Sequence, residues 1–545
     1  MPSRLRSLVM VLLAVSAWAG ARPVALAQTS GGFGLQPADD PRLAQNLSNA
    51  GSPFSPATDR FTLQSGAGAT GYDSTNVRRQ RAAQRARSRA QAAPQLSGAQ
   101  AATARALSHD APQRYRREVV PPPPGANGTS APLVIVPIHR RQRLDPEPFA
   151  PLGVRAGSFL LFPSVELIGG YDSNPLRLQA GKPDAYTLAV VPELLVRSQW
   201  TRHALNADIR GGYLWYSRSF ANVAALDPTT SIANGGIPES LDRPNAEARV
   251  IGRLDVHDRS HADAEARLTV GTDNPGSPNI SAGLVQLPIF TRIGGSLGYT
   301  QNFNRLDVTV KGGIDRVAYQ DSLLTDGSKS SNEDREYQQY SWALRSSYEL
   351  TPAVRPFVEV LGDARRHDLP FDRNGIQRNS DAITGRGGTT FEFSRLLTGE
   401  ASAGYLTRRY KDPTLPDLSG LVADASLIWV PTGLTTVTFT ARSASDESVV
   451  ASVSGLLRRD FIVQVDHAWR RWLIGTFRAG MGFDDYASND TPRKDERFFL
   501  SAALVYKLSR DLQVRGELRR DWLKSSIDTA SYEANAALIG IKWQR

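Results

Sequence analysis

The chain has 545 residues, a formal net charge of +10, a mean hydropathy of −0.33 and no cysteine. Because cysteine is absent, the sequence excludes a disulfide framework and a thiolate metal site. The low mean hydropathy argues against a helical membrane protein, whereas a membrane-spanning β-barrel fits it because half of each strand is polar.

The N-terminus carries the features of an export signal. Arg4 and Arg6 precede a short apolar stretch, and Ala25-Leu26-Ala27 forms a cleavage motif. Residues 1–27 are therefore predicted to be a signal peptide. An uncleaved anchor is the alternative, but the apolar stretch is too short to span a bilayer.

Residues 28–157 are rich in Pro, Ala and Arg and show no periodicity, so we predict a disordered periplasmic segment. The excess of positive charge lies in this segment and leaves the region that follows close to neutral. The arginines between Arg78 and Arg89 are either an anchor to anionic envelope polymers or a solvated charge run. An exported chain is not expected to bind nucleic acid.

Residues 158–545 alternate apolar and polar side chains, as in Leu512–Trp522, and this period of two predicts strands. Tight turns such as Phe303-Asn304-Arg305 alternate with long polar stretches such as 220–243. That order is typical of an up-and-down barrel, with short turns on the periplasmic rim and long loops outside. We therefore predict an all-β fold: a closed antiparallel transmembrane barrel of about 18 strands (16–18) with both termini in the periplasm.

The last strand leaves its register open. Its lipid face is either Tyr532, Ala534 and Ala536 or Ile539, Ile541 and Trp543, because a slip of one residue exchanges the two faces.

The first barrel strand carries a family resemblance. The segment Phe159–Pro175 reads FLLFPSVELIGGYDSNP, with Pro163 early and Tyr171, Asp172 and Asn174 at the far end. This pattern resembles the putative β-barrel porin 2 family, and the resemblance covers the barrel region. It implies a barrel in the outer membrane of a Gram-negative bacterium, in contact with outer-membrane lipids and the barrel-insertion machinery.

The polar face of the strands should line the lumen. Charged rings in a water-filled channel set ion selectivity, and an excess of arginine on one wall would give a mild anion preference. A ladder of cross-strand salt bridges in the wall is an equally good interpretation. The predicted pore-lining residues are Asp208, Arg210, Arg249, Arg253, Asp263, Glu265, Arg267, Arg478, Arg515, Glu517 and Arg519.

No nucleophile elbow, zinc-protease motif or phosphate loop occurs, so no catalytic residue, metal ligand or cofactor is predicted and the protein is not expected to be an enzyme. The first hypothesis is a porin that lets small hydrophilic solutes diffuse passively. The alternatives are an outer-membrane port for an exopolysaccharide chain and a plugged structural or adhesive barrel. The sequence leaves the oligomeric state open.

Overall fold

The computed structural model describes residues 149–224, 236–393, 397–489 and 493–545. The predicted signal peptide and most of the predicted tail lie outside the described residues. Within them, the short strand β1 (Val154–Ala156) pairs with the first long strand, so pairing begins four residues before the predicted start of the barrel at residue 158.

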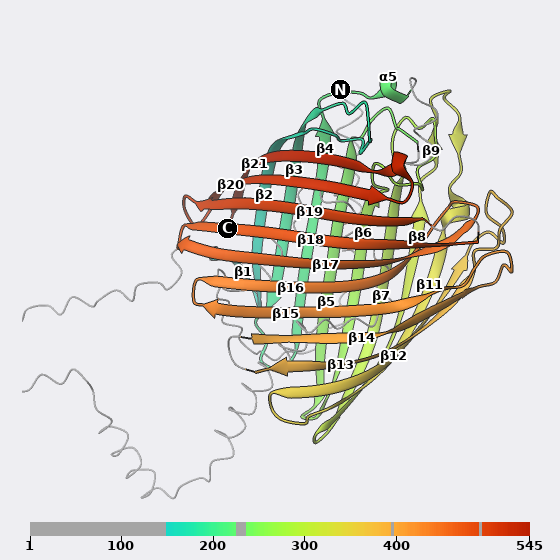
Figure 1. Cartoon of the computed structure of the whole chain (residues 1–545). Helices are drawn as coiled ribbons and strands as arrows, with labels where there is room; N and C mark the ends of the chain where they lie inside the picture. Colours follow the sequence, from blue (N-terminus) through green and yellow to red (C-terminus); the bar gives the residue numbers. More distant parts are fainter. Residues whose placement is uncertain (1–148, 225–235, 394–396, 490–492) are drawn as a thin grey trace, which may run out of the picture. The chain divides into compact units, whose positions relative to one another are not determined.

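Eighteen long antiparallel strands of the described residues form one closed barrel, which confirms the predicted fold (Figure 1). Each strand pairs with its neighbours in chain order, and β2 pairs with β21 to close the circle. The strands are β2 (Phe159–Asp172), β3 (Ala185–Ser198), β4 (Ala204–Tyr216), β5 (Arg243–His257), β6 (Ser260–Thr272), β7 (Ile289–Phe303), β8 (Leu306–Tyr319), β11 (Tyr337–Tyr348), β12 (Val354–His367), β13 (Ser380–Glu392), β14 (Leu397–Tyr410), β15 (Leu418–Thr432), β16 (Thr435–Glu447), β17 (Val453–Arg470), β18 (Leu473–Ser488), β19 (Lys494–Lys507), β20 (Leu512–Ser525) and β21 (Tyr532–Gln544).

Short turns alternate with longer loops along the whole barrel, so all the loops meet at one end. The turns at 258–259, 304–305, 433–434 and 471–472 have two residues each. The loops are L1 (173–184), L2 (217–242), L3 (273–288), L4 (320–336), L5 (368–379), L6 (411–417), L7 (448–452), L8 (489–493) and L9 (526–531). L2 contains α5 (Ala221–Ala224), L4 contains β9 (Ser322–Leu323), β10 (Lys329–Ser330) and η3 (Glu333–Arg335), and L9 contains η4 (Asp528–Ala530).

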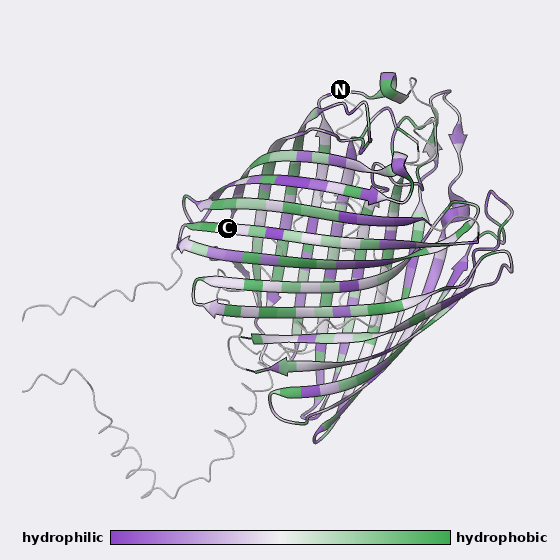
Figure 2. Ribbon diagram, viewed as in Figure 1, coloured by the Kyte–Doolittle hydropathy of each residue, from purple (hydrophilic) through white to green (hydrophobic). Residues whose placement is uncertain are grey.

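The two faces of the strands differ in polarity, and Figure 2 shows the hydropathy changing from residue to residue along them. Outward side chains such as Leu297 (72% exposed) are apolar, whereas inward ones such as Gln339 (1% exposed) are polar and covered. On β21 the outward face is Ile539, Ile541 and Trp543, each at least half exposed. The second of the two registers left open by the sequence is therefore present.

An apolar cluster joins the first four loops at the loop end of the barrel. Its buried members include Leu176 from L1, Leu241 from L2 and Leu284 from L3, and Leu324 from L4 packs against them. Burial of these side chains stabilises the loops over part of the lumen. No helix among the described residues is long and apolar enough to cross a membrane.

Candidate functional site: the lumen and its loop-end cavity

The predicted pore-lining residues of β4, β5 and β6 all lie on the inward face. Asp208 is opposite Arg249, and Arg253 is opposite Asp263. Arg210 faces Glu247 on β5 and Glu193 on β3. Each strand thus presents charges of both signs to the next.

These inward charges form ion pairs that run round the wall. Arg249 binds Glu265 at 3.1 Å between adjacent strands. Arg267 reaches past β7 to Asp315 on β8, at 2.5 Å. Such pairs match the cross-strand ladder that the sequence suggested as one interpretation of these residues.

The predicted residues on β18 and β20 form a second inward group. Arg478 is 6% exposed, with its guanidinium 5.6 Å from the centre of the Phe499 ring. On β20, Arg515 pairs with Glu517, and Arg519 pairs with Asp521 at 2.7 Å. The eleven predicted residues therefore form two inward groups rather than one ring.

The residues that carried the family resemblance have structural partners. The Asp172 carboxylate is fully buried and binds Arg177 at 2.9 Å. The Asn174 side chain donates to the carbonyl oxygens of Leu178 and Glu533, at 2.7 and 2.8 Å. Glu533 lies on β21, so Asn174 fastens L1 to the last strand.

The other two residues of that motif lie at opposite ends of β2. The Tyr171 hydroxyl donates to Asp184 at the end of L1, at 3.1 Å. The carbonyl oxygen of Pro163 accepts from the Arg545 backbone N–H at 3.1 Å. Tyr171 and Asp172 therefore link β2 to L1, Asn174 links L1 to β21, and Pro163 links β2 to the C-terminal residue.

Loop L3 reaches L7, although the strands that flank the two loops are nearly opposite in the strand order. The side-chain oxygen of Asn279 in L3 accepts the Val449 backbone N–H of L7 at 3.2 Å. L3 also touches L1, since a Cβ on Gly276, whose φ is +80°, would lie 2.9 Å from the Arg177 Cβ. L3 therefore narrows the lumen at the loop end.

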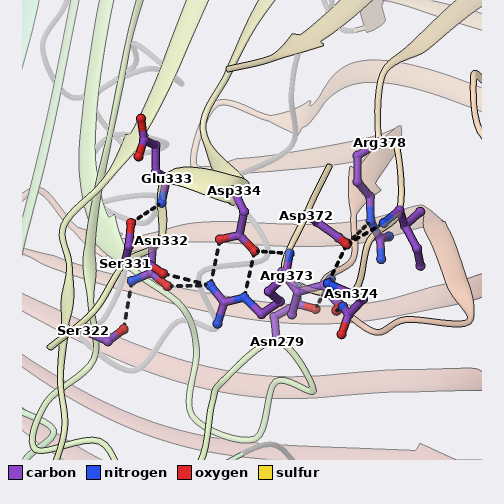
Figure 3. Close-up of polar contacts among 12 residues, drawn as sticks. Asn279, Ser322, Ser331, Asn332, Glu333, Asp334, Asp372, Arg373, Asn374 and Arg378 are labelled. Atoms are coloured by element: carbon purple, nitrogen blue, oxygen red, sulfur yellow. Dashed lines mark hydrogen bonds and ion pairs between the residues drawn. The ribbon is translucent and has the colours of Figure 1, made fainter. Parts of the chain in front are cut away.

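Loops L4, L5 and L7 are joined by a polar network (Figure 3). Arg373 of L5 binds Asp334 of L4 at 2.7 Å, and Arg378 donates to the carbonyl oxygens of Ser448 and Val453 at 2.7 Å. Burial by itself raises the pKa of the Asp334 carboxyl, but the hydrogen bonds from Arg373 outweigh it and hold that pKa below its usual range. The L4–L5 ion pair is therefore charged at neutral pH.

The narrowed loop end encloses a cavity with about 200 Å³ of space accessible to water. Loops L1, L3, L4, L5, L7 and L8 contribute to its wall, together with inward residues from strands around most of the barrel. Arginines, carboxylates and the rings of Tyr216, Tyr319, Tyr337, Tyr486 and Tyr532 line it. Polar groups around a confined wet space can bind and select a small hydrophilic solute.

None of the eleven predicted pore-lining residues lines this cavity. The sequence analysis did not select Arg243, Arg292, Tyr319 or Tyr337, which stand at strand ends next to the long loops. Arg292 shares the parity of the inward residues Gly294 and Ser296. Extending the alternation to the first residues of β7 could therefore have found it.

The sequence of the barrel matches one family over nearly three quarters of the chain. The family is described as putative beta-barrel porin 2, and the match covers residues 147–545. The chain belongs to this family. Its membership makes the protein a porin-like barrel of the outer membrane, in contact with that membrane and with small solutes, and porin barrels are typically not enzymes. No curated protein sequence is significantly similar to this porin.

Solved structures that resemble this porin share little sequence with it. OpdK of Pseudomonas aeruginosa, solved with vanillate, is 11% identical with a TM-score of 0.36, over 71% of this chain and 99% of OpdK. OccAB2 of Acinetobacter baumannii is 12% identical with a TM-score of 0.36, over 72% and 99%. A mutant of the ferric enterobactin receptor PfeA of P. aeruginosa is 7% identical with a TM-score of 0.34, over 71% and 80%.

Proposed function

We propose that this protein is a porin through which small hydrophilic solutes diffuse passively, with selection at the loop-end cavity. The observation that carries the proposal is the water-accessible space among charged inward side chains, where L3 meets L7. A barrel of this strand number encloses an aqueous channel unless something fills it. The eleven inward charges predicted from the sequence are proposed to line the path below the cavity.

The proposal includes an orientation. Both ends of the barrel sequence lie at the end with the short turns, since β2 and β21 both run between that end and the loops. Short turns face the periplasm in outer-membrane barrels. The termini are therefore proposed to be periplasmic and the loop-end cavity to open to the outside.

The tyrosines of the cavity favour a second candidate, the port of an exopolysaccharide chain, because aromatic faces pack against sugar rings. A polymer needs an open lumen, however, and the contact between Asn279 and Val449 crosses it. The polymer port therefore requires L3 to move, whereas small solutes need only the space beside it.

The test is single-channel conductance of the purified protein in a planar bilayer, with and without residues 28–157. We expect stable steps whose size rises with salt concentration in both forms. A third form, in which residues 275–279 of L3 are replaced by two glycines, should conduct more, since the narrowing is removed. If only the L3 variant conducts, the result would favour the polymer port. If none of the three forms conducts, the barrel is plugged.

A further inference from the structure

The charges that line the loop-end cavity do not balance. Every carboxylate in its lining has an arginine partner within 4.0 Å. The pairs are Asp273–Arg335, Asp334–Arg373, Asp372–Arg378, Asp446–Arg458, Glu447–Arg365, Asp484–Arg497 and Asp495–Arg493. The acids are therefore neutralised, and any further arginine in the lining leaves a net positive charge.

Three further arginines line the cavity. Arg177 is paired with Asp172, which leaves Arg243 at the start of β5 and Arg292 near the start of β7. Neither the Arg243 nor the Arg292 side chain forms an ion pair or a hydrogen bond with any residue in the described part of the chain. The Arg243 Nη1 and the Arg292 Nε are buried and have no acceptor. A buried guanidinium N–H without an acceptor is costly, so these groups are suited to bind an anion from the solvent.

Aromatic side chains stand beside both guanidinium groups. Arg292 on β7 is opposite Val317 on β8, and Val317 is in turn opposite Tyr337 on β11. The next inward pair of β7 and β8 is Phe290 and Tyr319. Arg243 is opposite Leu214, two residues from Tyr216 on the same face of β4. The hydroxyl groups of Tyr216, Tyr319 and Tyr337 form no hydrogen bond with a described residue, so they also remain available to a solute.

We propose that Arg243 and Arg292 bind the carboxylate of a ring-bearing solute, whose ring packs against the tyrosines of the same wall. Guanidinium groups match a carboxylate in charge and in hydrogen-bond geometry. The tyrosine rings of this wall supply aromatic faces against which the ring of the solute can pack. The inference rests on the proposed function, because it names the class of solute that the porin selects.

Binding is measured by calorimetry on the full-length protein in detergent, so the readout does not need an open channel. The probes are glucuronate and benzoate, which carry a ring and a carboxylate and distinguish a sugar acid from an aromatic acid. Glucose supplies a ring without the charge, and acetate supplies the charge without a ring. At least one ring carboxylate should bind more tightly than both glucose and acetate.

The variants are Arg243→Gln, Arg292→Gln and the double variant. Each lost charge-assisted contact should raise the Kd of the ring carboxylate about tenfold. The matched control is Arg409→Gln, which removes an arginine that is 80% exposed at the loop end and does not line the cavity. Its Kd should equal that of the wild type.

The proposed binding site and the proposed porin function can be disproved independently of each other. If glucuronate and benzoate bind no better than glucose and acetate, or if the double variant binds them like the wild type, the site is wrong even in a conducting porin. If the wild type binds a ring carboxylate and the double variant does not, the binding site is supported. This holds even if the protein shows no conductance in the bilayer and the porin proposal is therefore wrong. In a conducting protein, reversal potentials should show anion preference in the wild type and less in the double variant, and cation preference in the wild type would overturn the site.

Discussion

Asn174 shows how one side chain of a family motif can close a barrel. It is fully buried, and besides its bonds to Leu178 and Glu533 its side-chain oxygen accepts the Leu178 backbone N–H at 3.0 Å. The contact to Glu533 could not be predicted, because it joins residues 359 positions apart and exists only once the first and last strands meet.

The variant Asn174→Ala should lower the free energy of unfolding by about 3 kcal/mol, since it removes three hydrogen bonds worth about 1 kcal/mol each. The measurement is urea unfolding in lipid vesicles, followed by tryptophan fluorescence. Asn489→Ala is the control, because its amide makes one exposed hydrogen bond to the Thr414 carbonyl oxygen. The control should lose less than about 0.5 kcal/mol, and equal losses in the two variants would contradict the role given to Asn174.

At the scale of the strand, the period of two was sufficient to predict the barrel and most of its faces. Side chains that face lipid are apolar and those that face the water-filled lumen are polar, so the two alternate along each strand. The period failed to decide the register of β21 for a physical reason. The inward side chains Ala536 and Leu538 pack with Ile168, Val191 and Leu214 in an apolar patch inside the barrel. Both faces of β21 are therefore apolar, and polarity cannot distinguish them.

The loops could be predicted only as loops. Their lengths and polarity place them at one end of the barrel, but the inward path of L3 depends on Asn279 meeting Val449, 170 residues later. The cavity is made by such contacts. The strand pattern therefore predicted inward charges elsewhere on the barrel wall, whereas the residues that line the cavity, on loops and at strand ends, were missed.

The assignment of faces is tested on two neighbours in β13. Ile383 is 56% exposed on the outward face, and Thr384, opposite Leu361 and Leu406, points inward. A lysine on the lipid face costs up to about 2–4 kcal/mol, the most at the middle of the bilayer, so Ile383→Lys, near the loop end of β13, should lower the stability in vesicles by up to that amount. Thr384→Lys should lower it by less, and the opposite ranking would mean that the two faces are exchanged.

At the scale of the whole molecule, the barrel depends on one junction, where β21 pairs with β2. An ion pair spans this junction: Lys542 of β21 binds Glu193 of β3 at 2.7 Å across the intervening β2, and Ser164 of β2 donates to the same carboxylate at 3.1 Å. Both charged side chains are about nine-tenths covered. Three strands at the junction thus share one buried carboxylate.

Removing one partner of a covered ion pair leaves the other charge uncompensated, which costs about 3–5 kcal/mol. We expect Lys542→Met to lower the free energy of unfolding in vesicles by up to that amount, because Arg210 still faces Glu193. The double variant with Glu193→Gln should recover part of the loss, because the carboxylate that lost its lysine is gone. Lys411→Met removes the lysine of the exposed pair with Asp381, 2.9 Å apart, and should cost less than about 1 kcal/mol. Equal losses for the two lysines, or no recovery in the double variant, would mean that the ion pair does not hold the junction and that backbone pairing of β2 with β21 closes the barrel unaided.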